Sequence, residues 1–128
     1  MADTLSNVFN VMNVARSNGK STCVLGPNSK LLVKVLEIIK ENKYIKNFEV
    51  INDARGGFIK VELSDYMNKC KAIRPRLPIK SEEITKYEKR FLPSIGFGII
   101  ILSTNKGLMT NKDAKQQRVG GTLVAYVY

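Results

Sequence analysis

The chain has 128 residues, 44% of them hydrophobic, which is enough for one globular domain or two small lobes with a real core. Its 21 Lys and Arg residues outnumber its 11 Asp and Glu residues, and the resulting formal charge of +10 favours a polyanionic partner. We expect no membrane span and no secretory signal, and the absence of histidine excludes Ser-His-Asp triads and zinc sites that need imidazole.

The first half of the chain is predicted to fold as α-β-α-β-β. Apolar residues recur at steps of three and four from Leu5 to Ala15, which predicts a helix that Asp3 or Thr4 caps and Asn18-Gly19 ends. A second helix, capped by Asn28 or Ser29, is expected to run to about residue 42, with Leu31, Leu32, Val35, Leu36 and Ile39 facing inward. The strands of this half are expected at residues 21–25, 44–51 and 58–63, and the last two form a hairpin.

The second half is predicted to be mostly β with short helices. Prolines limit residues 66–77 to an edge-like or irregular strand, and residues 81–90 form an amphipathic helix. Residues 97–102 are apolar on both faces and so predict a buried strand, which an exposed loop at 103–107 follows. A short helix capped by Thr110 or Asn111 and a final strand at 122–128 complete the chain. We therefore predict an α+β fold with an N-terminal α/β lobe at 1–64 and a C-terminal β-rich lobe at 65–128.

The polar segment Ser103–Gly107 is the strongest candidate for a recognition site. A buried strand would present it in a fixed geometry, which is a common way to build a binding site. The hydroxyls of Ser103 and Thr104 and the amide of Asn105 can donate and accept hydrogen bonds across the shallow minor groove of RNA. Lys106 can contact a phosphate, and Gly107 permits close backbone approach. A plain polar turn is the alternative interpretation.

Basic side chains are concentrated in the same half of the chain. Residues 65–128 carry 12 basic and 5 acidic side chains, against 9 and 6 in residues 1–64. Within the predicted helices, Lys112 and Lys115 are three residues apart, and Tyr87 lies among basic residues, where it could stack on a base or belong to the core. This distribution favours a nucleic-acid surface over a merely solvated one. The basic residues of the two helical segments are Lys86, Lys89, Arg90, Lys112, Lys115 and Arg118.

Residues 98–110, GIIILSTNKGLMT, resemble the signature of the universal small-subunit ribosomal protein eight family. In that family an apolar strand runs into Ser-Thr-Ser-Lys-Gly, so Asn105 is a polar replacement for the usual Ser or Thr. Further matches cover essentially the whole chain, and some of them resemble the archaeal and eukaryotic branch of the family. These matches are Ser29-Lys30-Leu31, Asn68-Lys69-Cys70, Arg74-Pro75-Arg76, residues 89–93, Gly120-Gly121 and the ending Ala125–Tyr128.

The resemblance implies a structural protein of the cytoplasmic small ribosomal subunit, with no catalytic activity and no cofactor. It implies binding to the central domain of small-subunit rRNA, at a stem with an irregular internal loop, and contact with neighbouring ribosomal proteins. The main RNA contact would be Ser103–Gly107, and lesser contacts would come from Ser29, Lys30, Tyr87, Gly120 and Gly121.

Two other functions share the same sequence features. Some members of the family also bind a similar stem in their own messenger RNA and repress translation, so a free-standing RNA-binding regulator is one alternative. An enzyme acting on RNA is the other, and without histidine its general base would have to be Asp, Glu, Lys or Tyr. The two cysteines, Cys23 and Cys70, lie in separate apolar segments, and we expect both to be free buried thiols.

Overall fold

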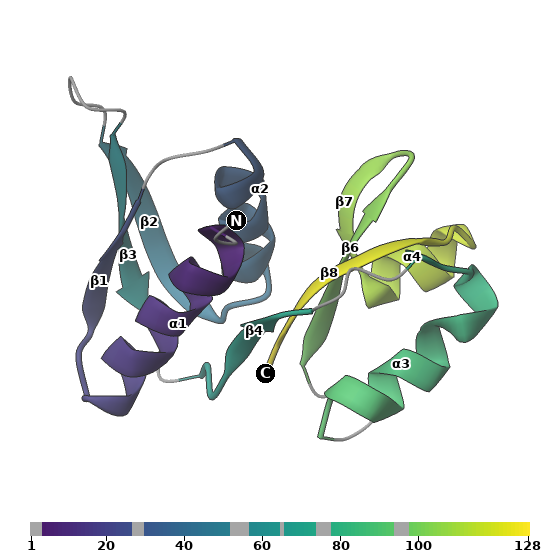
Figure 1. The fold of residues 1–128 in the computed structure, drawn as a ribbon, viewed down its shortest axis with the longest axis horizontal. Helices are drawn as coiled ribbons and strands as arrows, with labels where there is room; N and C mark the ends of the chain where they lie inside the picture. The colour runs from purple at the N-terminus through teal and green to yellow at the C-terminus, as the bar shows by residue number, and fades with distance from the viewer. Residues whose placement is uncertain (1–3, 27–29, 52–56, 65, 74–77, 94–97) are drawn as a thin grey trace. The chain divides into compact units, whose positions relative to one another are not determined.

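The computed structural model describes residues 4–26, 30–51, 57–64, 66–73, 78–93 and 98–128. The chain divides into two compact units, Met1–Cys70 and Lys71–Tyr128 (Figure 1). The segment before the division belongs with the first unit because the Asn13 side chain hydrogen-bonds both backbone groups of Cys70, at 2.6 and 3.0 Å, and Arg16 Nε donates to the Met67 carbonyl at 3.1 Å. The sequence pattern, in contrast, divides the chain after residue 64.

The first unit has the predicted order α-β-α-β-β. Its strands form an antiparallel sheet in the order β1-β3-β2, and both helices cover one face of that sheet (Figure 1). The alternating residues Ile59, Val61 and Leu63 of the central strand are buried, as their period of two predicts. The elements are α1 (Thr4–Ser17), β1 (Thr22–Leu25), α2 (Lys30–Glu41), β2 (Ile45–Ile51) and β3 (Phe58–Leu63).

Helix α1 ends as its sequence predicts. Gly19 adopts φ +73°, its N–H donates to Arg16 at 3.1 Å, and the N–H of Lys20 donates to Ala15 at 2.9 Å. These two bonds form a Schellman motif with glycine in the left-handed position. The predicted caps at residues 3, 28 and 29 lie outside the described residues.

One residue of α2 was assigned to the wrong face. Leu31 is 38% exposed, whereas the other four predicted inward residues are buried. Leu31 lies in the first turn of α2, at the margin of its apolar face, and its side chain is partly exposed to solvent. The helix therefore packs through Leu32, Val35, Leu36 and Ile39.

The second unit is built on a mostly antiparallel sheet in the order β4-β8-β6-β7, with β5 also paired to β8. Its core includes Ile84 from α3, Ile100 and Leu102 from β6, Ala114 from α4 and Leu123 from β8. The mixed α+β class is confirmed. The elements are β4 (Cys70–Ala72), β5 (Pro78–Ile79), the 3-10 turn η1 (Ser81–Glu83), α3 (Ile84–Phe91), β6 (Ile99–Thr104), β7 (Gly107–Thr110), α4 (Asn111–Gln117) and β8 (Gly121–Val127).

Two predictions for this unit need correction. The strand expected over residues 66–77 is reduced to β4 in the described residues, at the edge of the sheet. The loop expected at 103–107 is instead part of a hairpin, because β6 continues through Thr104 and the chain returns as β7 from Gly107. Ser103 pairs with Leu108 on one side and Thr122 on the other, so two neighbouring strands supply hydrogen-bond partners that polar composition does not reveal. Among the described residues, no helix is long and apolar enough to cross a membrane.

Candidate RNA-binding surface

The tip of the β6–β7 hairpin is held by the side chain of Thr104. Its hydroxyl donates to the Gly107 carbonyl at 2.8 Å and accepts from the Lys106 N–H at 3.1 Å. Thr104 and Gly107 form the last strand pair, so Asn105 and Lys106 make the turn, and Gly107 adopts φ +107°, a conformation that favours glycine. The tip thus has one defined backbone shape.

The predicted recognition residues do different things in this hairpin. Ser103, Asn105 and Lys106 are exposed, and each carries a polar group that faces solvent. Thr104 is only half-exposed, and its single donor is already used within the tip. The hairpin therefore offers a hydroxyl, an amide and an ammonium group in a row, on a backbone that Thr104 fixes.

Two glycines at the start of β8 allow close backbone packing, Gly121 against this hairpin and Gly120 against β5 and the residue after it. A Cβ atom on Gly121 would lie 2.5 Å from the Ser103 carbonyl oxygen and 2.9 Å from Cγ2 of Thr104. A Cβ atom on Gly120 would lie 2.4 Å from the Ile79 carbonyl oxygen. The structure thus brings Gly121 together with Ser103 and Thr104 at the base of the tip, whereas Gly120 packs against Ile79 and Lys80.

Helix α4 is tied to α3 and to β6 by a buried polar network. Asn111 is 1% exposed, and its Oδ1 accepts from the N–H of Ile100 at 3.0 Å. Its Nδ2 donates to Oε2 of Glu88, whose Oε1 pairs with Lys115. Sequence reasoning missed Glu88 because its partners are 23 and 27 positions away, and considered Asn111 only as a helix cap; Thr110 is the cap, accepting from the Asp113 N–H at 3.3 Å.

This network makes the two predicted lysines of α4 unequal. The charge of Lys115 is offset by Glu88, whereas Lys112 is exposed and has no ion pair among the described residues. Of these two lysines, Lys112 is therefore the one whose charge a phosphate would meet without a competing carboxylate among the described residues.

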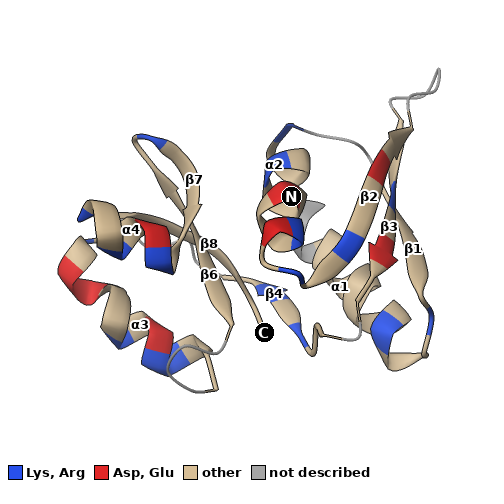
Figure 2. Cartoon of the chain, turned by 180° about the vertical axis from the view of Figure 1, so that it is seen from behind, with Lys and Arg blue, Asp and Glu red and all other residues tan. Residues whose placement is uncertain are grey.

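Tyr87 on α3 is half-buried and packs against the core of the second unit. Its ring stacks on Phe91 with centroids 6.2 Å apart, and the Nζ of Lys86 lies 5.7 Å from its centroid. The interpretation of Tyr87 as a partly buried core residue is confirmed, and its stacking on a base stays a prediction. Lys86, Lys89 and Arg90 are exposed on the same helix, and Figure 2 shows the basic residues of α3 and α4.

The first unit supplies one described candidate. Lys30 is exposed at the start of α2, and Ser29 lies outside the described residues.

The cysteines and acidic residues show no sign of a metal or nucleophile site in the described part of the chain. Cys23 and Cys70 are free thiols as predicted, but only Cys70 is buried, since Cys23 on the edge strand β1 is half-buried. Burial raises their pKa values to about 11 and about 12, with a further contribution to Cys70 from Cys23. A thiol with so high a pKa is protonated and a poor nucleophile at neutral pH. No group of three or more Cys, Asp and Glu among the described residues could hold a metal ion.

These features define a class of small, basic α+β proteins that present a rigid polar hairpin beside basic helices. Residues 3–128 match the family model for Ribosomal protein S8. The chain is 48% identical over 128 residues to "Small ribosomal subunit protein uS8" of Nanoarchaeum equitans, covering 100% of this chain and 96% of that protein. It is 49% identical over 126 residues to the protein of the same name from Archaeoglobus fulgidus, covering 98% of each.

The chain therefore belongs to the ribosomal protein S8 family, whose members are structural proteins and not enzymes. This confirms the resemblance of residues 98–110, including its archaeal and eukaryotic character, because both of these relatives are archaeal.

Proposed function

We propose that this chain is a structural constituent of the small ribosomal subunit in the cytoplasm, where it binds the central domain of small-subunit rRNA and aids its assembly. Membership of the ribosomal protein S8 family supports the ribosomal role. The observation that carries the RNA site is the β6–β7 hairpin, which exposes Ser103, Asn105 and Lys106 on a backbone that Thr104 fixes.

The proposed contact divides affinity from specificity. Lys106 and Lys112 contact phosphates, which adds affinity for any RNA and depends strongly on salt. Ser103 and Asn105 donate to and accept from ribose hydroxyls and base edges in the wide, shallow minor groove of a stem that is opened by an internal loop. Tyr87 adds a ring face at the side of this surface. A similar stem in the chain's own messenger RNA would fit the same surface, and neighbouring ribosomal proteins would contact other faces.

Equilibrium binding tests this proposal with two RNAs of equal length, a central-domain stem with its internal loop and a fully paired stem. We expect a preference for the looped stem that persists as salt is raised. Asn105→Ala should reduce that preference about tenfold, since a specific hydrogen bond contributes about 1–2 kcal/mol. Asn47→Ala is the matched control, because Asn47 is also an exposed asparagine and lies on β2 of the first unit. Equal binding of both stems that collapses with salt would contradict the specific site.

A further inference from the structure

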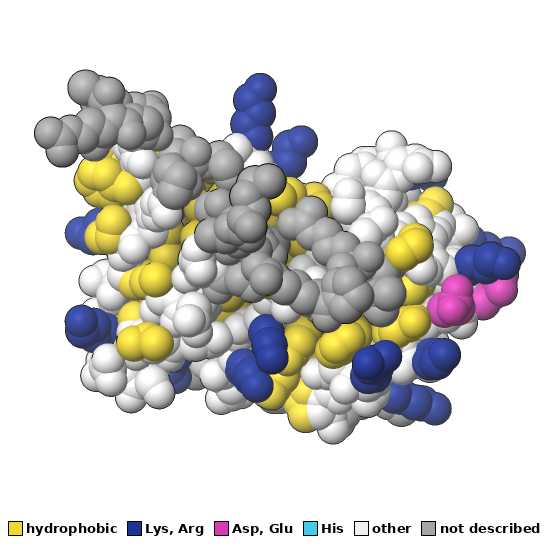
Figure 3. All heavy atoms as spheres, in the orientation of Figure 1, with side chains coloured by type: hydrophobic (Ala, Val, Ile, Leu, Met, Phe, Trp, Pro, Cys, Tyr) yellow, Lys and Arg dark blue, Asp and Glu magenta, His cyan; other side chains and the backbone are white. Residues whose placement is uncertain are grey.

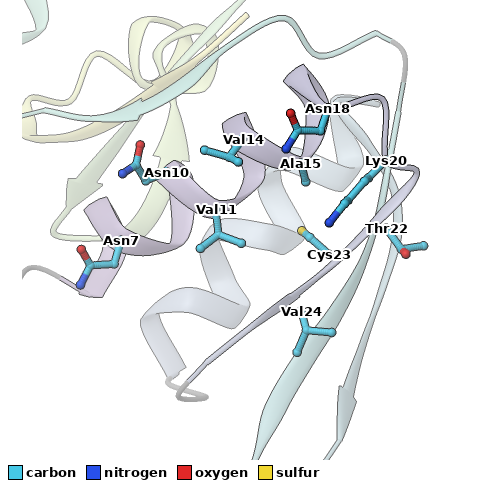
Figure 4. Close-up of a pocket in the computed structure, with 10 residues that line it drawn as sticks. All are labelled: Asn7, Asn10, Val11, Val14, Ala15, Asn18, Lys20, Thr22, Cys23 and Val24. Atoms are coloured by element: carbon cyan, nitrogen blue, oxygen red, sulfur yellow. The ribbon is translucent and has the colours of Figure 1, made fainter.

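The first unit has an open groove between α1 and β1. It has a volume of about 530 Å³, and Figure 4 shows its lining side chains coming from one face of α1 and from β1. Its apolar lining includes Val11, Val14 and Val24, which are 44%, 54% and 56% exposed. Polar side chains make up the other half of the lining, namely Asn7, Asn10, Asn18, Lys20 and Thr22. Hydrophobic side chains are visible over α1 and β1 in Figure 3. Such apolar exposure on neighbouring elements is typical of a surface that a partner covers.

The strand beside this groove has a free edge. Among the described residues β1 pairs only with β3, and the Leu63 N–H donates to the Ser21 carbonyl at 2.8 Å. Residues of an antiparallel strand point their backbone groups alternately toward and away from the neighbour, so Ser21, Cys23 and Leu25 bond β3. Thr22 and Val24 therefore point their N–H and C=O groups away from the sheet, and both residues line the groove.

The two edges of this sheet differ in their protection. The β2 edge carries the exposed charges Lys46 and Glu49, and its register shifts between Ile45 and Asn47. Charges and irregular register of this kind prevent a further strand from pairing. The β1 edge has neither device, because the segment Thr22–Leu25 is uncharged and its register with β3 is continuous. An unprotected edge next to a groove with exposed valines indicates that a strand pairs there.

Charge decides which strand fits. Lys20 is the one charged residue among those that line the groove, and no carboxylate accompanies it. One lysine is too few for a nucleic-acid surface, which neutralises several phosphates. A second copy of this chain would bring its own charge of +10, which opposes self-pairing. The lining instead suits small apolar side chains against Val11 and Val14, polar groups at the asparagines beside them, and a carboxylate near Lys20.

We infer that the β1 edge and the α1–β1 groove bind an extended, acidic segment of a neighbouring ribosomal protein, which adds to the sheet as a fourth strand. Alternate side chains of this segment lie in the groove against Val11 and Val14, and its backbone hydrogen-bonds Thr22 and Val24. The identity of the partner as a ribosomal protein rests on the proposed function, whereas the strand-binding edge does not.

A peptide titration tests the inference on the full chain. The probe is the acetylated and amidated peptide EVTVTVE, which alternates groove-facing valines with threonines and carries carboxylates at its ends. Amide hydrogen exchange by NMR reports on each backbone N–H. At millimolar peptide we expect exchange of the outward amides of Thr22 and Val24 to slow at least tenfold, because they gain hydrogen bonds only when a strand is added.

Two sets of controls isolate strand addition. Thr22→Pro removes one outward N–H and leaves the bonds between β1 and β3, and proline is tolerated at the first residue of a strand. This variant should bind the peptide at least fivefold more weakly, whereas Asn47→Ala, on the opposite edge of the same sheet, should bind as the parent does. In an added strand only alternate N–H groups point toward β1. Of two peptides, one N-methylated on all valines and the other on all threonines, only the peptide that keeps the inward N–H groups should therefore still bind.

Several outcomes would overturn the inference. One is an absence of protection at Thr22 and Val24 with millimolar peptide in a chain whose other amides stay protected. Tighter binding of eight-nucleotide oligouridylate at the same residues would assign the groove to RNA. Protection that rises with protein concentration alone would assign the edge to a second copy of the chain. None of these results changes the preference for the looped stem, which depends on the second unit, so the two proposals fail separately.

Discussion

Asn111→Ala tests whether the buried amide holds the second unit together. The N–H of Ile100 is its hydrogen-bond donor, and Ile100 is itself 1% exposed. Leaving this N–H without an acceptor costs about 1–3 kcal/mol, and losing the bond to the carboxylate of Glu88 adds about 1 kcal/mol, since that carboxylate keeps Lys115 and partial access to water. We expect the free energy of unfolding to fall by about 2–4 kcal/mol.

Exchanging the amide of Asn111 and the carboxylate of Glu88 tests whether the hydrogen bonds, and not only the volume of the side chain, stabilise the second unit. Asn111→Asp keeps an acceptor for the Ile100 N–H but sets a second carboxylate against Glu88, so at neutral pH it should be destabilising. Adding Glu88→Gln restores one amide and one carboxylate in exchanged positions. The double variant should therefore recover at least half of the stability that Asn111→Asp loses.

Urea denaturation measures these changes, and exchange of the amides of β6 and β8 assigns them to the second unit. A cost below about 0.5 kcal/mol for Asn111→Ala would refute the reasoning, because it would mean that water replaces the amide at Ile100. Strict additivity of Asn111→Asp and Glu88→Gln would refute the proposed coupling.

Three further predictions follow from the site and the core. Lys112→Ala should reduce the slope of log affinity against log salt by about 0.7–0.9 on RNA, whereas Lys115→Ala should change it by less than half as much, and equal slopes in binding titrations would contradict the pairing of Lys115. Gly121→Ala should lower the free energy of unfolding by about 1–3 kcal/mol and weaken binding to the looped stem, because its Cβ would meet a backbone carbonyl at 2.5 Å; a stable variant with normal binding would disprove this close packing. Burial raises the pKa values of Cys23 and Cys70 from the ordinary 9.0 to about 11 and about 12, so the stability from their neutral forms is fully present below pH 9 and is lost as pH rises through the folded values. Urea unfolding at pH 8 and pH 10.5 should show this loss, and a variant with both cysteines replaced by alanine should show less of it.

Local signals in the sequence were sufficient for most of the first unit. The apolar period of α1 and the glycine at its end act within a few residues of the chain, so both could be predicted. The alternation in β3 likewise predicts which face is buried. Leu31 shows the limit of this reasoning, since the margin of an apolar arc depends on where the sheet ends.

Long-range partners explain what the sequence could not predict in the second unit. Ser103 and Thr104 are polar and precede a glycine, so local propensity favours a loop, yet strands on both sides of β6 extend it to the tip. The network of Asn111 with Glu88 and Ile100 joins residues far apart in sequence. The motif at 103–107 still located the candidate site, because its position after a buried strand is a local feature.

In the β6–β7 hairpin, the residues that determine the backbone shape differ from those whose side chains are exposed to solvent. Thr104 and Gly121 determine where the backbone runs, through two hydrogen bonds and a close approach. The side chain of Asn105 contributes to none of these contacts, so its identity does not determine the shape of the tip. Under the proposed function, substitutions at Ser103 and Asn105 would therefore change which RNA is selected and leave the backbone of the hairpin as it is.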